Sequence, residues 1–389
     1  MEATEKQAGT GGGWGSLTPG DCRLLGASAV LTAGAGVTRY VGTGRVVPFV
    51  VSALALAALA AVVGRSVDRL GDRLGAGTTG VVQSALGNLP ELFVGIFALR
   101  AGLVGVVEAA LVGSILANVL LVLGLAFVVG GLRHGPQRFH GGTARGVALL
   151  LVLSVFLIMI PSLSAHLGTA AAGHEKALSD VTAVVLLCVF ALSIPASLRR
   201  REGETGEPGE SGGSGEPESG SGERVEDAAV GAVEGPAWPL SLVLAVLLVS
   251  SVAAAFVSDW FVTALSPALV VFHMSQAFAG LVVVAIAGNA VENVVGIQLA
   301  ARNRPDYALA VILQSPVQIA YALFPALVLL SPLLGGAALT LVLPPLLLVV
   351  LVISAVVAAV VVFDGESTWL EGACLIGLYA VIATAFWWG

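Results

Sequence analysis

Two glutamates, Glu91 and Glu292, lie within apolar stretches of the chain, and each follows an asparagine by three residues. The first stands in GNLPELFVGIFALR and the second in GNAVENVVGIQLA. Residues three apart share one face of a helix, so Asn88 and Asn289 would each present an amide beside a carboxylate. A carboxylate at mid-bilayer costs about 2.5–3.5 kcal/mol on insertion scales, so its presence there indicates function by default.

Both motifs carry residues that loosen a helix. Gly87 and Gly288 precede the asparagines, and Pro90 adds a second disturbance in the first copy. A break frees backbone carbonyls, and irregular backbone at membrane depth is tolerated where it lines a cavity. Carboxylate, amide and carbonyl oxygens together suit a hard cation such as Ca²⁺, which takes roughly 6–8 oxygen ligands. The absence of thiolate and histidine from this set argues against zinc or copper.

Two other apolar stretches place polar residues at helical spacing. Ser114 and Asn118 are four apart in GSILANVLLVLG, and Ser315 and Gln318 are three apart in QSPVQIAYALFP. Lone serines in membrane helices commonly bond within or between helices. Because these serines recur in step with the glutamates, we predict that they line the same cavity as a second layer.

The two motifs belong to an internal repeat at a constant offset of 201 residues, with eight identities across 28 positions. The polar pairs are Gly87 with Gly288, Asn88 with Asn289, Glu91 with Glu292, and Ser114 with Ser315. Chance repetition of apolar letters would not select Asn, Glu and Ser.

The elements that must position these residues are membrane helices. The chain of 389 residues is 57% apolar and 11% charged, whereas soluble proteins carry about 25% charged residues. Apolar runs of roughly 20 residues predict spanning helices. Eleven are expected, at 24–41, 46–64, 78–100, 104–131, 144–165, 177–198, 238–264, 277–301, 307–331, 335–362 and 368–388.

The sequence predicts an all-α membrane protein built from an extra helix and two repeats. The expected segments are a polar tail at 1–23, an extra helix at 24–45, five-helix repeats at 46–198 and 238–389, and an acidic flexible linker at 199–237. With five spans each, the repeats enter the membrane from opposite sides. Such inverted repeats are typical of secondary transporters that work by alternating access.

The distribution of Lys and Arg residues predicts the orientation of the protein in the membrane. With eleven spans, fourteen Lys and Arg residues fall on the side of the N-terminus and four on the other. The positive-inside rule then places the N-terminus in the cytoplasm and the C-terminus outside. The Ala-, Gly- and Val-rich, lysine-poor composition suggests a bacterium, so we expect a multi-pass protein of the inner (plasma) membrane.

Several classes of function are disfavoured. No GxxxxGK[ST] motif or domain-sized soluble region supports ATP-driven transport. A membrane hydrolase would need a nucleophile or metal beside the glutamates, and no intramembrane His cluster or Ser–His pairing occurs, so no enzyme is predicted. No cofactor is expected, and no basic, aromatic-bearing surface indicates nucleic acid. Asp68 and Asp259 are possible points of cation access, and Glu108 is expected to be exposed or to line a funnel.

The motifs carry a family resemblance. GNLPELFVGIFALRAGL…GSILANVLLVLG resembles the first alpha repeat of the cation/calcium exchanger superfamily, in its calcium/proton (CAX-type) branch, which typically reads GNAPEL and GSILGNLLLVLG. GLVVVAIAGNAVENVVGIQLAARNRPDYALAVILQSPVQIA is similar to the second repeat of that branch. Sodium/calcium exchangers generally carry GTSxPE and GSNxFN instead. The resemblance covers roughly residues 46–388.

This resemblance implies a secondary transporter that exports Ca²⁺ in exchange for protons. Glu91 and Glu292 would carry either load, since a divalent cation or protons can neutralise them, and an unloaded pair is costly to move. Asn88, Asn289, Ser114, Asn118, Ser315 and Gln318 would be their neighbours. The expected partners are Ca²⁺, protons and membrane lipid.

The sequence also departs from the family pattern. Asn293 replaces a histidine, and Gln314-Ser315-Pro316 replaces a GSS triplet. Leu89 and Ala117 replace smaller residues. These changes leave both glutamates intact but keep two alternatives open: an antiporter for Mn²⁺, Na⁺ or K⁺, and a cation-binding protein without transport.

Overall fold

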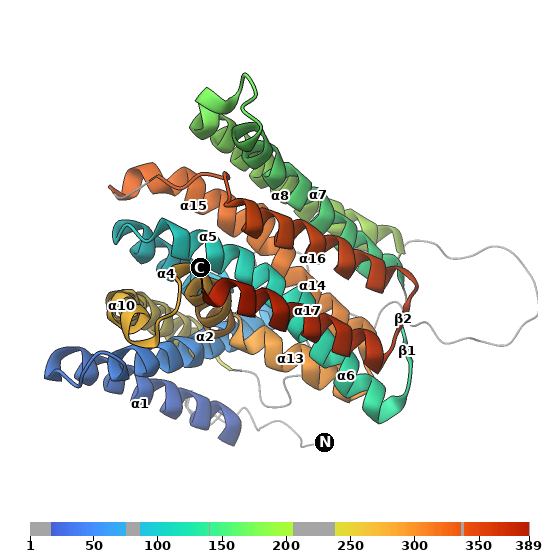
Figure 1. Cartoon of the computed structure of the whole chain (residues 1–389). Helices are drawn as coiled ribbons and strands as arrows, with labels where there is room; N and C mark the ends of the chain where they lie inside the picture. Colours follow the sequence, from blue (N-terminus) through green and yellow to red (C-terminus); the bar gives the residue numbers. More distant parts are fainter. Residues whose placement is uncertain (1–16, 75–85, 140, 205–237, 336–337, 389) are drawn as a thin grey trace, which may run out of the picture.

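The computed structural model describes residues 17–74, 86–139, 141–204, 238–335 and 338–388. They form an all-α membrane protein in which long helices lie in one bundle (Figure 1). The N-terminal half contains α1 (Pro19–Val41), α2 (Val47–Leu74), α4 (Leu89–Arg100), α5 (Val104–Leu116), the π-helix η1 (Ala117–Val122), α6 (Leu123–His134), β1 (Gln137–Arg138), α7 (Gly141–His166), the short 3-10 helix η2 (Ala172–His174) and α8 (Glu175–Glu204).

The C-terminal half begins with a single long helix and ends with another. Its elements are α10 (Leu240–Phe272), α11 (Gln276–Phe278), the π-helix η3 (Ala279–Val284), α12 (Ala285–Gly288), α13 (Ala290–Ala301), α14 (Pro305–Gln318), the π-helix η4 (Ile319–Leu323), α15 (Phe324–Leu330), the 3-10 helix η5 (Ser331–Leu334), α16 (Pro345–Phe363), β2 (Glu366–Ser367) and α17 (Trp369–Trp387).

Within the described residues, nine helices are long and apolar enough to span a membrane, and a tenth span arises if the bent pair Gln276–Gly288 and Asn293–Ala301 is counted as one. The predicted span at 78–100 is not among them, because residues 75–85 lie outside the described part and α4 alone has 12 residues. The count of eleven, the division into repeats and the linker at 205–237 therefore stay predictions.

Some predicted boundaries differ from the structure. Helix α1 begins at Pro19 rather than 24, because Thr18 and Asp21 form a capping box that satisfies its first backbone amides. Helix α8 runs to Glu204, into the segment assigned to the linker. Helix α10 passes Pro267 and ends at Phe272 rather than near 264.

The predicted span at 335–362 is wrong at its start, because the helix begins only at Pro345. Two consecutive prolines, Pro344 and Pro345, favour extended backbone before a helix. The buried backbone before them is satisfied by hydroxyl groups: Ser331, Ser179 and Ser162 accept from the amides of Leu339, Leu341 and Leu343. Irregular backbone is tolerated at this depth because protein partners replace the missing helical bonds.

Helix α1 is attached to the bundle by an ion pair whose carboxylate is buried. Asp21, in its first turn, accepts a hydrogen bond of 3.0 Å from Arg65 Nε of α2. The Asp21 side chain is 1% exposed, and the same carboxylate caps the helix through Thr18. This interaction fixes the end of a helix whose remaining surface is largely exposed.

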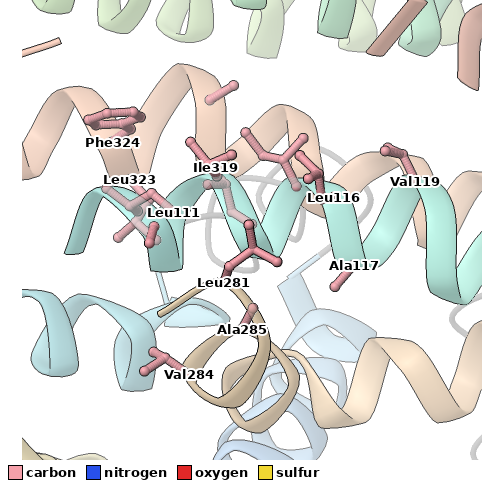
Figure 2. Packing of buried hydrophobic residues seen from close by; sticks show 14 of the residues in the cluster. Leu111, Leu116, Ala117, Val119, Leu281, Val284, Ala285, Ile319, Leu323 and Phe324 are labelled. Atoms are coloured by element: carbon pink, nitrogen blue, oxygen red, sulfur yellow. The ribbon is translucent and has the colours of Figure 1, made fainter. Parts of the chain in front are cut away.

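Helices from the two halves interlock. Helix α2 packs on α10, α5 on η3, α6 on α17, and α7 on α16, so one apolar core contains residues from both halves. Figure 2 shows this core around α5 and η1, where their apolar side chains meet those of η3 and α12 and those of η4 and α15. They include Leu111 and Leu116, Leu281 and Ala285, and Ile319 and Phe324.

The contact between α5 and η3 is made backbone to backbone through glycines. A methyl group on Gly113 would lie 2.3 Å from the Leu281 carbonyl oxygen, and one on Gly280 would lie 2.4 Å from that of Val106. Neither carbonyl can rotate away as a side chain does. These two glycines therefore set how closely α5 approaches η3.

We expect Gly113→Ala to lower the melting temperature of the purified protein strongly, since overpacking a core costs about 1–3 kcal/mol and occasionally more. The matched control is Gly146→Ala on α7, where an added methyl group meets nothing within 4 Å. Thermal unfolding in detergent measures both. Equal melting temperatures for the two variants would contradict the close approach.

A short strand pair connects two loops at one end of the bundle. Strands β1 and β2 pair antiparallel, with Gln137 opposite Ser367 and Arg138 opposite Glu366 (Figure 1). Gln137 Nε2 also donates to Ala300 O at 3.2 Å and to Asn303 Oδ1 at 2.9 Å. The end of α6, the end of α13 and the start of α17 thus meet on one side.

Candidate functional site

The two motifs form two short helices with matching bounds. Helix α4 runs from Leu89 to Arg100 and α13 from Ala290 to Ala301, each 12 residues long. Each begins after its asparagine, and the backbone angles of these residues nearly coincide: φ −93° and ψ 15° at Asn88, φ −97° and ψ 20° at Asn289.

The predicted break in the second motif is confirmed by a bend of 63° between the helices before and after Asn289. In the first motif, Gly87 and Asn88 form a turn directly before α4. The loosened helix predicted from the glycines is therefore present at both copies.

Glu91 contacts the other motif directly. Its Oε1 atom accepts a hydrogen bond of 2.6 Å from Asn289 Nδ2 and one of 3.2 Å from Ser114 Oγ. Glu91 is half-buried, whereas the side chains that donate to it are buried. The structure thus brings together a carboxylate of the first motif, the amide of the second and a serine of α5.

Asn289 is the centre of this group. It is 1% exposed, and its Nδ2 atom lies 3.0 Å from Ser114 Oγ and 3.0 Å from Ala285 O. Its Oδ1 atom accepts from Ser315 Oγ at 3.1 Å and from Asn118 Nδ2 at 3.3 Å. One side chain at the helix break therefore bonds to residues of both halves.

The asparagine of the first motif makes a corresponding contact. Asn88 Nδ2 donates to Gln318 Oε1 of α14 at 3.2 Å. Asn118 and Gln318 thus make equivalent contacts, because each forms a hydrogen bond with the motif asparagine of the other half. Six of the predicted neighbours, Asn88, Asn289, Ser114, Asn118, Ser315 and Gln318, are buried and joined in pairs or larger groups.

The buried polar residues around Asn289 include one acceptor atom without a hydrogen-bond donor among the described residues. Asn118 is fully buried, and its Oδ1 atom has no hydrogen-bond partner among the described residues. Buried polar atoms are rarely left unpaired. A carbonyl-type oxygen beside Asn289, Ser114 and Glu91 adds to the oxygen-rich character of the site, which suits a hard cation.

Gly288 makes room for Glu91. A methyl group on this glycine would lie 2.7 Å from Cγ and 2.8 Å from Oε1 of Glu91. The sequence interpretation gave Gly288 the role of loosening the helix. The structure adds a second reason for glycine, since any side chain here would displace the carboxylate.

Two π-helical turns begin beside these residues, and sequence reasoning did not predict them. The turn η1 starts at Ala117 and contains Asn118, and η4 starts at Ile319, directly after Gln318. A π-turn widens the helix and commonly occurs at functional sites. No residue type signals a π-turn in a single sequence, so Asn118 and Gln318 could be placed only as members of regular helices.

Other predicted residues lie elsewhere or outside the described part. The side chains of residues 290–292, and with them the carboxylate of Glu292, are not described. Asp68 is half-buried near the end of α2, and Asp259 is exposed on α10. Glu108, expected to be exposed or to line a funnel, is instead buried at 9% exposure, because α5 is enclosed by helices of both halves.

The positions that depart from the family pattern are spread over the site's surroundings. Gln314 is exposed, whereas Pro316 is buried in the last turn of α14. Asn293 Oδ1 is buried without a hydrogen-bond partner among the described residues. Neither Gln314 nor Asn293 bonds to the group around Asn289, within the part of the chain that the structure describes.

Comparison with known proteins gives concordant results. The model of the family described as "Sodium/calcium exchanger protein" matches residues 45–198 and 242–388. A "Ca(2+)/H(+) antiporter" of Aphanothece halophytica is 31% identical over 342 residues, which cover 87% of this chain and 89% of that protein. The "Ca(2+)/H(+) antiporter ChaA" of Bacillus subtilis is 30% identical, covering 87% and 91%.

Among solved structures, the Ca²⁺/H⁺ antiporter protein YfkE matches with a TM-score of 0.75 and 27% identity, covering 94% of this chain and 99% of that one. The resemblance stated from the motifs is thereby confirmed over most of the chain.

Proposed function

Because the chain belongs to the sodium/calcium exchanger protein family, we propose that it exports Ca²⁺ from the cytoplasm in exchange for protons. One observation carries this proposal. The Glu91 carboxylate of the first motif is hydrogen-bonded by Asn289 of the second motif, within a layer of buried amides and hydroxyls. The names of the two relatives described above point to the same two ions.

The chemistry of the residues around Glu91 supports binding of either Ca²⁺ or protons. The amide and hydroxyl donors around Glu91 stabilise its charge, but they carry no charge themselves. In an environment of low polarity, the ionised form of a carboxylate is costly. Binding of a divalent cation stabilises the ionised form, and binding of a proton neutralises the carboxylate. The protein can therefore move Glu91 between the two sides with one load or the other.

We propose that Glu292 is the second carboxylate of this site. It follows Asn289 by three residues, as Glu91 follows Asn88. The matching bounds of α4 and α13 support a similar placement at the start of the second helix. With both carboxylates, Ca²⁺ would be neutralised by two charges, and two protons would replace it. Alternating access through the two halves would complete the cycle.

We place the protein in the inner (plasma) membrane with the N-terminus in the cytoplasm. This orientation rests on the Lys and Arg distribution. The pairing of β1 with β2 is consistent with it, because the two loops that they occupy fall on the cytoplasmic side in the eleven-span arrangement.

A second candidate is exchange of another cation, such as Mn²⁺, Na⁺ or K⁺. The observation that favours Na⁺ or K⁺ is the amide-rich layer, in which Ser114, Asn118 and Asn289 place uncharged groups around Glu91. A monovalent ion needs less negative charge than Ca²⁺, and carboxylate number is one basis of selectivity.

The two candidates are separated by transport in proteoliposomes that enclose a pH-sensitive dye. We expect an inward Ca²⁺ gradient to drive proton efflux, with Mn²⁺ competing weakly and Na⁺ and K⁺ without effect at equal ionic strength. Protein-free liposomes give the leak rate. Proton movement driven by Na⁺, K⁺ or Mn²⁺ but not by Ca²⁺ would reject the proposal, and no coupled flux with any cation would favour a binding protein without transport.

A further inference from the structure

A crevice of about 540 Å³ lies between α4 and α10, apart from the group around Asn289. Phe93 and Phe97 of α4 form one wall, and α10 forms the other with Ser251, Val252, Ala255, Phe256 and Asp259. Helices α4 and α10 pack against each other at one end of the bundle (Figure 1). The crevice has the size of a small-molecule site, which is typically apolar with a few placed polar groups.

The single charge in this crevice has no partner among the residues that the structure describes. Asp259 is exposed, and its carboxylate forms no hydrogen bond or ion pair with any described residue. It stands at one end of the stripe of α10 residues that begins with Ser251. The eight helical steps from Ser251 to Asp259 correspond to about 12 Å along the helix. The crevice is therefore a long apolar groove with an anionic end.

The anionic end is level with the ends of two neighbouring helices. Trp260, next to Asp259, packs edge-on against Tyr40 at a ring separation of 6.4 Å, and Tyr40 is the penultimate residue of α1. Phe261 stacks on Phe49 at 5.4 Å, three residues into α2. Both contacts place Asp259 level with the C-terminal end of α1 and the N-terminal end of α2, and the groove runs from there along α10 towards Ser251.

A positive group lies near the same end. The Arg39 guanidinium is 5.9 Å from the ring centroid of Tyr40, which itself contacts Trp260. Arg39 is thus linked through the Tyr40 ring to Trp260, the residue that follows Asp259. This pattern is complementary to a molecule with an ammonium group, a phosphate and a long apolar chain.

We propose that the crevice between α4 and α10 binds a phospholipid with a primary amine headgroup. The ammonium group donates hydrogen bonds to Asp259, because a carboxylate accepts them and a primary ammonium has three to give. The phosphate faces Arg39, which suits guanidinium. One acyl chain follows Phe97, Phe256 and Phe93 into the membrane. The ring faces add a cation–π attraction for the ammonium group.

This binding is separate from cation exchange. Glu91 lies two residues before Phe93 on α4, but neither Glu91 nor Asn289 lines the crevice. A lipid held here stabilises the contact between α4 and α10, and its loss leaves the hydrogen bonds around Asn289 unchanged.

The proposal is tested by retention of lipid on the purified full-length protein. The protein is exchanged into detergent containing equal amounts of phosphatidylethanolamine, phosphatidylcholine and phosphatidylglycerol with identical acyl chains, and bound lipid is counted by native mass spectrometry. We expect at least about fivefold preference for phosphatidylethanolamine, since the charged pair forms at an exposed carboxylate, where such pairs contribute modestly. Asp259→Asn should reduce this preference to that for phosphatidylcholine.

Two variants control the result. Asp364→Asn changes an exposed acid at the end of α16 and keeps an acceptor for the amide of Glu366, so lipid retention should not change. Phe256→Ala should reduce retention of all three lipids, because it removes part of the chain-binding wall.

Equal retention of the three lipids by the unsubstituted protein would overturn the proposal, whether or not the variants fold. Unchanged preference in Asp259→Asn would also overturn it. If that variant instead slowed Ca²⁺ uptake, Asp259 would be assigned to cation access. If dodecylammonium bound while no phospholipid was retained, the groove would be a site for soluble amphiphiles and the lipid would be rejected.

Discussion

Glu91→Gln is expected to abolish cation-driven proton flux while leaving the protein folded. Glutamine keeps an oxygen that accepts from Asn289 and Ser114, so the local hydrogen bonds survive. It carries no negative charge and takes up no proton, so both loads are lost. The loss should be on the order of 100-fold or more, since about 3 kcal/mol of cation binding corresponds to two factors of ten.

The measurement is proton flux in proteoliposomes under a Ca²⁺ gradient, with reconstituted protein quantified and its melting temperature determined. Glu175→Gln, at an exposed position where α8 begins, is the matched control and should transport normally. Normal flux in Glu91→Gln would show that the carboxylate carries neither ion, and the proposed function would lose its central residue.

Gly288→Ala is expected to reduce transport without changing any charged or hydrogen-bonding group. The added methyl group would lie 2.7 Å from Glu91 Cγ, so the carboxylate must move away from Asn289. Overpacking of this kind costs about 1–3 kcal/mol. We expect flux to fall on the order of 10-fold, because an error of about 1 Å in the position of a ligand is enough to impair a preorganised site.

The control for this variant is Gly377→Ala on α17, which is also a helical glycine but has nothing within 4 Å of an added methyl group. Calcium binding in detergent, measured by calorimetry, distinguishes a displaced ligand from slow motion of the helices. Wild-type affinity and flux in Gly288→Ala would contradict the close packing of Gly288 on Glu91.

The sequence predicted which polar residues lie together better than it predicted the ends of the helices. Asn88, Asn289 and their serine and amide neighbours were identified because a polar residue in an apolar run is conspicuous, and a constant offset repeats the pattern. The structure places them within hydrogen-bond distance of one another. Which atom bonds to which could not be predicted, since it depends on helices far apart in the chain.

The errors have physical causes. The helix expected from 335 begins only at Pro345. The residues before it are apolar in sequence, but their backbone is not helical, because serine hydroxyls of other elements accept hydrogen bonds from its amides. Glu108 is buried because η3 and other helices enclose α5. Its position near the end of a predicted span did not indicate that the side chain would be buried. The π-turns at Ala117 and Ile319 widen helices without a change in residue type.

The strand pair between β1 and β2 restricts how the halves can move. It joins a loop of residues 46–198 to one of residues 238–389, and Gln137 adds two bonds from the first loop to the end of α13. Pulling the halves apart at this end would break all of these contacts together. A movement of the halves that keeps these contacts would have to separate helices that lie away from the strand pair, such as α2 and α10.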